Sequence, residues 1–213
     1  MHDPTSNLSL PAAMTLPDLF TIQQFEQHRH ELPDGGRWSE LSAGMVLNLS
    51  PPTAEQGTVV MNLGKALAAY TQREKKGYAC FELGFLLSRE PATLRFPPLC
   101  FFASGQMFYE TDKMWTERRP DLVVEIPSTS DRRRGLDERI SEWLKWGAGM
   151  VWALDPLSRQ AHSFESHRSG QRLHAEQTLL GGKPLLGFAM TVGDLFREPE
   201  WVTTNRAPPP SLN

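Results

Sequence analysis

Residues 117–156, which read ERRPDLVVEIPSTSDRRRGLDERISEWLKWGAGMVWALDP, decide the fold. Within them, residues 122–126 form a short apolar run enclosed by prolines, a pattern typical of a strand buried on both faces. A turn rich in hydroxyl residues then leads to a helix over 137–146, and a second strand follows Gly147 over 150–154. Strand, helix and strand with short connections predict a crossover unit with parallel strands in an α/β sheet.

Glu125 lies inside the first of these apolar runs. A carboxylate in a buried strand is costly unless a cation, a metal or hydrogen bonds compensate it. We therefore expect any chemistry that the chain performs to gather at Glu125.

The length of 213 residues predicts one domain over 17–198, preceded by a flexible arm over 1–16 and followed by a flexible tail over 199–213. Hydrophobic residues at 39% and charged residues at 22% indicate a folded globular protein and exclude a disordered one. The formal charge of -3 gives no overall basic field, so nucleic-acid binding would have to rest on a local patch.

Cys80 and Cys100 each lie in an apolar strand-like run and form neither a disulfide framework nor a zinc-site pattern. We interpret them as buried thiols in a reducing compartment. No stretch approaches the roughly 18 apolar residues of a membrane span, and no basic region followed by an apolar one opens the chain. We therefore expect a cytoplasmic protein that does not bind membranes.

Periodicity and turn residues predict the remaining elements. They are a helix over 22–31 with a capping box at Thr21 and Gln24, a hairpin of 37–41 and 45–49, a long helix over 53–76, one strand over 78–88, strands over 94–96 and 99–102 broken by Pro97-Pro98, a hairpin of 160–165 and 171–177, and a short helix over 192–196. Together they predict a mixed α/β sheet with one large helix on each side.

Several segments resemble those of one protein family. They are Arg37-Trp38-Ser39-Glu40-Leu41, Ser50-Pro51-Pro52, Leu63-Gly64, the strand and turn at 120–130, Leu185-Leu186-Gly187-Phe188 and Asp194-Leu195-Phe196. Together they are similar to the Uma-two family, which is described as putative restriction endonucleases, over about residues 17–197. The resemblance implies the PD-(D/E)XK restriction-endonuclease-like fold, a mixed sheet flanked by helices.

The resemblance also implies an activity, which is metal-dependent hydrolysis of phosphodiester bonds in nucleic acid, expected to be DNA. Carboxylates would hold Mg²⁺ or Mn²⁺ beside the scissile phosphate, where the ion activates water and offsets developing charge. A lysine would orient the water or stabilise the transition state. The family places a glutamate in the first hairpin, an aspartate in a middle strand, a glutamate in the next strand and a lysine on the following helix.

Only some of the family's site residues are present at the matching positions of this chain. Glu40 matches the hairpin glutamate and Glu125 the central glutamate, but the aspartate position is Pro98, which has no side-chain ligand atom. The lysine aligns with Arg139, which keeps the charge but has a different geometry and does not give up a proton. A histidine often found before the long helix is Gln56 here. The resemblance therefore implies a nuclease scaffold with an impaired site.

Two carboxylates could replace the missing ligand. Asp121 shares a strand face with Glu125, but four strand residues span roughly 13 Å, which is too far for both to hold one ion. Glu82 is the better candidate, with a solvated strand residue as its alternative. Glu125 itself is either a metal ligand or a relic that pairs with Arg139 or Lys65.

Arg132, Arg133 and Arg134 stand where a helix begins, near the expected site. They are candidates to contact nucleic-acid phosphates, and a solvated loop is the alternative. Trp143 and Trp146 lie on the same helix and are expected either in the core or on a homodimer face.

These residues lead to two functional hypotheses. The first is a metal-dependent endonuclease with ligands Glu40, Glu125 and Glu82, catalytic residues Glu125, Arg139 and Glu40, and weak or absent activity. The second is a non-catalytic nuclease-fold protein that binds DNA or a protein partner. The first requires another carboxylate close to Glu125, and the second predicts that an arginine or lysine neutralises Glu125.

Overall fold

The central strands of the protein follow the order that the sequence predicts. We describe them from a computed structural model, which covers residues 19–105, 114–166 and 168–199. The arm expected over 1–16, and the tail expected over 199–213 apart from its first residue, lie outside these residues.

Six strands form the larger sheet, in the spatial order β11-β10-β9-β8-β6-β3. They are Tyr78–Phe81 (β3), Leu99–Phe102 (β6), Leu122–Glu125 (β8), Met150–Asp155 (β9), Gln160–Glu165 (β10) and Arg168–Leu173 (β11). Strands β8 and β9 run parallel, with Val123 opposite Val151, and all other neighbours in this sheet are antiparallel. The predicted crossover unit is confirmed.

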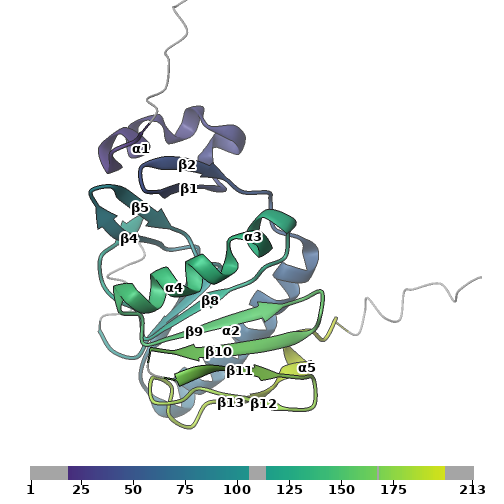
Figure 1. Ribbon diagram of the computed structural model, residues 1–213. Helices are drawn as coiled ribbons and strands as arrows, with labels where there is room; N and C mark the ends of the chain where they lie inside the picture. The colour runs from purple at the N-terminus through teal and green to yellow at the C-terminus, as the bar shows by residue number, and fades with distance from the viewer. Residues whose placement is uncertain (1–18, 106–113, 167, 200–213) are drawn as a thin grey trace, which may run out of the picture.

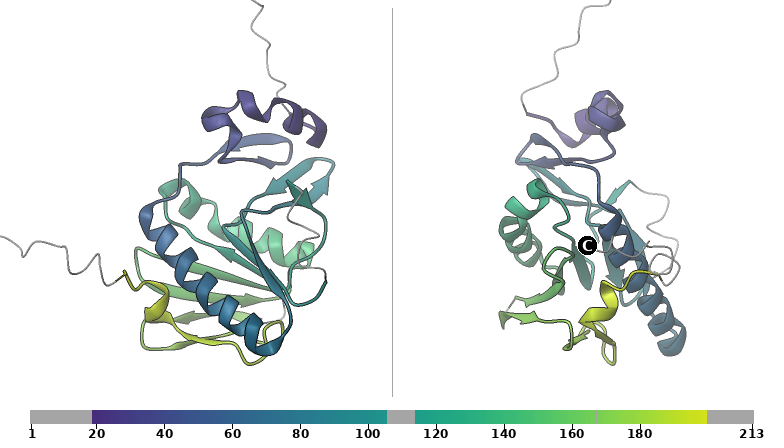
Figure 2. Two further views of the ribbon diagram at one scale, coloured as in Figure 1. Left: turned by 180° about the vertical axis from the view of Figure 1, so that it is seen from behind. Right: turned by 90° about the vertical axis from the view of Figure 1, so that its right-hand side faces the viewer.

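Two helices cover the two faces of this sheet, as Figure 2 shows in its right-hand view. Helix α2 (Ala54–Glu74) packs its apolar stripe on one face, and α4 (Leu136–Trp146) packs on the other, after the short helix α3 (Ser130–Arg134). Gly147 ends α4 in the left-handed conformation, with φ 107°. Each face of the buried strands therefore contributes to a separate apolar core.

Five strands form a second sheet, in the order β2-β1-β5-β4-β7. They are Ser39–Ser42 (β1), Met45–Asn48 (β2), Gly84–Arg89 (β4), Ala92–Arg95 (β5) and Trp115–Thr116 (β7). Helix α1 (Ile22–His28), which begins at the predicted capping box, packs against this sheet and is followed by the 3-10 turns η1 (Arg29–Glu31) and η2 (Pro33–Gly36). In Figure 1 this layer lies above α4.

The single strand predicted over 78–88 is wrong. The chain leaves the larger sheet after Phe81, takes a left-handed conformation at Glu82 with φ 52°, and enters the second sheet at Gly84. The alternation of apolar residues continues across this turn and hides it. A Cβ at Gly84 would lie 2.6 Å from the carbonyl oxygen of Met114, so only glycine allows the approach of β7.

The sequence predicted one mixed sheet, whereas the described residues form two main sheets. The chain passes between them at Glu82, from β3 to β4, and again at Pro97-Pro98, from β5 to β6. The interruption that the two prolines predict between these strands is confirmed. Cys80 lies opposite Cys100 across β3 and β6, and both side chains are buried, as expected.

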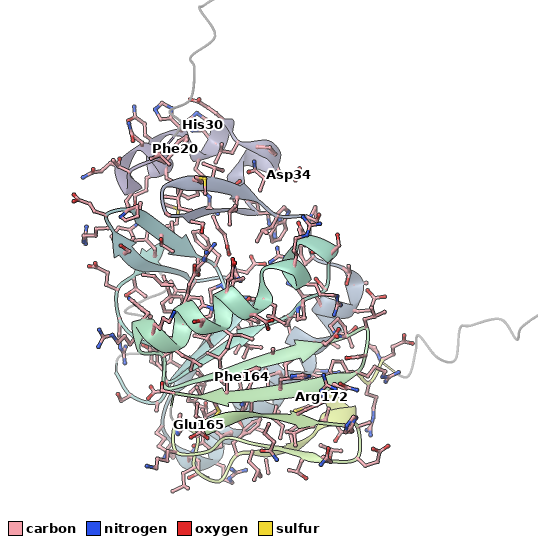
Figure 3. The ribbon with its side chains drawn as sticks, in the orientation of Figure 1. Phe20, His30, Asp34, Phe164, Glu165 and Arg172 are labelled. Carbon is pink, nitrogen blue, oxygen red and sulfur yellow. The ribbon has the colours of Figure 1, made fainter. Side chains whose placement is uncertain are left out.

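The chain closes with a small sheet that the sequence pattern did not predict, followed by the predicted short helix. These elements are Thr178–Leu180 (β12), Ala189–Thr191 (β13) and Val192–Leu195 (α5). Figure 3 places Phe20 and His30 in the layer of α1, whereas Phe164, Glu165 and Arg172 lie on the outer hairpin of the larger sheet. None of the helices in the described ranges is long and apolar enough to cross a bilayer.

The two-sided burial of β8 leads to a stability prediction. Leu122 is fully buried in the core beneath α2, so Leu122→Ala should lower the free energy of unfolding by about 2–5 kcal/mol through lost transfer energy and a cavity. Leu186→Ala is the matched control, because that side chain is 71% exposed and its loss should change stability by less than about 0.5 kcal/mol. Urea denaturation of both variants measures the difference, and equal losses would contradict the assignment of β8 to the core.

Candidate functional site

Glu125 ends strand β8 with its side chain toward α4, and it is 5% exposed. Arg139 Nη2 donates to Glu125 Oε1 at 2.9 Å, and Trp143 Nε1 donates to the same oxygen at 2.6 Å. The two donors are four residues apart on α4, which places them on one helix face. The buried carboxylate is thus compensated by α4, and its cationic partner is Arg139.

Glu40 lies on β1 in the other sheet and is 2% exposed. Its Oε1 accepts from Arg139 Nη2 at 3.2 Å and from the backbone N–H of Phe96 at 2.9 Å, and its Oε2 accepts from Arg139 Nη1. Arg139 therefore bridges Glu40 and Glu125, two residues 85 positions apart in the sequence (125 − 40). The structure brings together three of the residues that the sequence singles out.

Glu40 and Arg139 stabilise each other in their charged forms. Burial raises the pKa of Glu40, but the charges of Arg139 and Arg95 and the hydrogen bonds to the carboxylate lower it further, so that the net shift is downward. Burial lowers the pKa of Arg139, and the carboxylates of Glu125 and Glu40 raise it by more, so that the net shift is upward. The bridge is therefore a buried ion pair and not a pair of neutral groups.

Arg95 extends the bridge into a network, and sequence reasoning missed it. Arg95 Nη1 lies 3.4 Å from Glu40 Oε2, and its Nε and Nη2 form a two-pronged contact with Glu142 of α4 at 2.9 and 2.8 Å. The sequence signal that could have identified Arg95 is the one that identified Glu125, namely a charged residue between apolar neighbours in a strand. Trp143, expected in the core or on a dimer face, is fully buried and also binds Glu125.

A cavity of about 190 Å³ opens above Glu40. Its lining includes three arginines and two glutamates, and also Pro98, where the resemblance to the family leads us to expect an aspartate. The lining residues that matter for the site are Arg29, Arg37, Arg132, Glu40, Glu82, Gln56 and Pro98. Glu82 thus shares a cavity with Glu40, whereas Glu125 is not among the lining residues.

The three consecutive arginines separate when α3 forms. Arg133 binds Asp155 with contacts of 2.8 and 3.1 Å, and Arg134 is exposed. Arg132 lines the cavity, where its Nη2 donates to the carbonyl oxygen of Ser50 at 3.3 Å and its buried Nε has no hydrogen-bond partner among the described residues. Of the three, Arg132 is the one placed to meet a ligand in the cavity.

The remaining candidates lie apart from the bridge between Glu40 and Glu125. Asp121 Oδ2 accepts from the backbone N–H of Ala103 at 2.7 Å, so it joins the residue before β8 to the residue after β6. Lys65 lies on an exposed face of α2 and lines a different cavity. Gln56, at the position where the family often has a histidine, accepts from Ser128 Oγ at 2.7 Å.

This arrangement can be compared with known proteins. The model of the Uma2 family, described as "Putative restriction endonuclease", matches residues 22–193. The chain belongs to the Uma2 family. A comparison with curated proteins finds no match.

A solved structure supports the fold. The crystal structure of a "putative nuclease belonging to DUF820" from Anabaena variabilis ATCC 29413 superimposes with a TM-score of 0.68 at 17% sequence identity, over 83% of this chain and 97% of that one. At this identity the likeness shows the fold alone. This Uma2 protein therefore has the restriction-endonuclease-like fold, a mixed α/β arrangement with helices against its sheets.

The divalent ion that the restriction-endonuclease-like family implies does not fit the residues present. Glu40 and Glu125 both accept from Arg139, and Pro98 supplies no ligand atom where a third carboxylate is expected. Across the described ranges, no group of three or more His, Cys, Asp or Glu side chains is arranged to hold a metal ion. In this Uma2 protein the cation at the two glutamates is a guanidinium group.

Asp131 fixes the position of Arg132 and generates a pH prediction. Partial burial raises the pKa of Asp131, but hydrogen bonds from Thr129 and from the backbone of Ser50 and Arg132 lower it from 3.8 to about 2. The lowered pKa means that the ionised form stabilises the fold, fully above about pH 5 and progressively less as the pH falls toward 2.

We therefore expect the difference in unfolding free energy between the wild type and Asp131→Asn to be constant above about pH 5 and to shrink between pH 4 and pH 2. Urea denaturation at a series of pH values measures it. Glu138→Gln, an exposed change on α4, is the control and should leave the pH dependence unchanged. A difference that is independent of pH down to 2 would contradict the role of the ionised carboxylate.

Proposed function

We propose that this Uma2 protein is a non-catalytic relative of nucleases that binds nucleic acid at the cavity above Glu40. The observation that carries the proposal is the bridge from Arg139 to Glu40 and Glu125. It satisfies the condition that separates the two functional hypotheses, because an arginine neutralises Glu125. A guanidinium keeps its proton and does not activate a bound water as a metal ion does.

The charges around the cavity support the choice of nucleic acid as the ligand. Arg29, Arg37 and Arg132 line it, and the carboxylate of Glu40, another lining residue, is already paired. Burial is the largest contribution to the lowered pKa of Arg132, which means that its surroundings do not fully offset its charge. A phosphate group would supply that missing negative charge and accept from the buried Nε.

The endonuclease hypothesis has one observation in its favour, since Glu82 lies in the wall of the same cavity as Glu40. It requires that a divalent ion displace Arg139 from both glutamates while the fold is intact. The two proposals therefore differ in a property that can be measured directly, the binding of Mg²⁺ or Mn²⁺ at Glu125.

We expect calorimetry to detect neither Mg²⁺ nor Mn²⁺ binding at millimolar concentration in the wild type or in Glu125→Gln, because Arg139 fills the space between the glutamates. Plasmid and single-stranded DNA should stay intact in the presence of either ion. Binding of an ion that disappears in Glu125→Gln, together with cleavage, would refute the non-catalytic proposal and favour the endonuclease.

A second prediction concerns nucleic-acid contact. Arg132→Gln should weaken the binding of a fluorescent DNA oligonucleotide and reduce the slope of log K against log salt by about 1, because one phosphate contact is lost. Arg134→Gln is the matched control, two residues along and exposed, and should behave like the wild type. Anisotropy titrations with duplex DNA, single-stranded DNA and RNA measure both variants. Equal affinities in all three proteins would remove Arg132 from the contact, and no binding to any probe would refute the proposed function.

A further inference from the structure

Two carboxylates from different sheets converge on one cation in this protein. Glu40 comes from β1 and Glu125 from β8, and the cation comes from α4. Arg139 contacts both oxygens of Glu40 and one oxygen of Glu125, and all three side chains are almost fully buried. We propose that the Arg139 guanidinium fills a latent divalent-cation site between Glu40 and Glu125, so that the fold carries its own cation and is independent of metal.

Electrostatics requires a cation at this position. Two carboxylates that share one positive group repel each other more strongly when that group is removed, and Arg95 then remains as a cation beside Glu40 but not beside Glu125. A guanidinium meets the requirement because its five N–H donors lie in a planar fork that reaches several carboxylate oxygens at once. A hard divalent ion would meet it with the same carboxylate oxygens as ligands.

The third position of the site explains why the guanidinium is the better occupant here. Pro98 in the cavity lining offers no side-chain oxygen, and no third His, Cys, Asp or Glu among the described residues is arranged to hold an ion together with Glu40 and Glu125, so a divalent ion would have only these two carboxylates. Divalent ions of this kind bind more tightly as the number of charged ligands increases. A cation fixed covalently to α4 has no such dependence, because it does not have to be captured from solution.

A route for ions exists once the guanidinium is removed. Glu40 forms part of the cavity wall, and the cavity is open to solvent beside Glu82 and Arg37, both of which are exposed. An ion entering there would reach the carboxylate of Glu40 directly. This proposal shares with the proposed function the expectation that the wild type binds no divalent ion at Glu125. It does not depend on nucleic-acid binding, so the response of Arg139→Met to Mn²⁺ tests it separately.

The experiment replaces Arg139 with an apolar side chain of similar length. Arg139→Met should lower the melting temperature, and 10 mM Mn²⁺ should raise it again by about 3–6 °C for a site of millimolar affinity. The wild type should show no such shift. Mn²⁺ paramagnetic resonance should report ion binding in Arg139→Met alone.

Arg95→Met is the matched control, because Arg95 is a buried arginine of the same network that contacts Glu40 but not Glu125. A purely structural role for Arg139 predicts that the two variants behave alike, whereas the proposal predicts that Mn²⁺ rescues only Arg139→Met. Mn²⁺ shifts of equal size in both variants, or in the wild type, would overturn it, as would the absence of any shift in Arg139→Met.

Two further variants test whether carboxylate number and side-chain charge determine the response to Mn²⁺. Pro98→Asp combined with Arg139→Met adds the third carboxylate and should bind Mn²⁺ about tenfold more tightly than Arg139→Met alone. If Arg139→Met does not fold in the absence of metal, refolding in 10 mM Mn²⁺ should restore a cooperative melting transition. An unfolded Arg139→Met protein that Mn²⁺ does not rescue would overturn the proposal. Arg139→Lys retains a cation and should fold without responding to Mn²⁺.

Discussion

The guanidinium group of Arg139 is the interaction on which the two halves of the structure depend. Glu40 belongs to the five-stranded sheet, Glu125 to the six-stranded sheet, and Arg139 to the helix that lies against both. Desolvating three charges is costly, and their mutual attraction offsets this cost only while the network is complete. Loss of one partner leaves a buried charge without compensation. The bridge therefore links the two sheets through one side chain of α4.

Under the proposed function, the same bridge prevents the metal-dependent chemistry that the resemblance to the family implies. A metal ion between two carboxylates polarises phosphate and lowers the pKa of water, and both effects depend on open coordination positions. Arg139 donates its hydrogen bonds to the two glutamates, so its positive charge is offset inside the protein and is not available to a ligand. The charge that remains for a ligand belongs to the arginines of the cavity wall, and phosphate contacts of that kind position a nucleic acid without cutting it.

Sequence patterns predicted the parts of this architecture that are local. The apolar run of β8 and the helix after it follow from periodicity, and Glu125 stood out because a charge interrupts that run. The contact of Arg95 with Glu40 spans 55 residues and no periodicity encodes it. The break at Glu82 was hidden because apolar alternation continues through a left-handed residue. Which of Arg132, Arg133 and Arg134 reaches the cavity depends on the rotation of a single helical turn, which only the packed structure fixes.

The two departures from the family pattern at the site are coupled through charge. With an aspartate in place of Pro98, a third carboxylate would face a space whose cation, Arg139, already serves two. With a lysine in place of Arg139, a single ammonium would have to reach both glutamates without the planar fork that does so now. Reversing either change alone leaves a buried site with charge or geometry unmatched. Under the proposal, proline at 98 and arginine at 139 are two parts of one solution, in which the protein supplies its own cation and lacks the ligand that a metal would need.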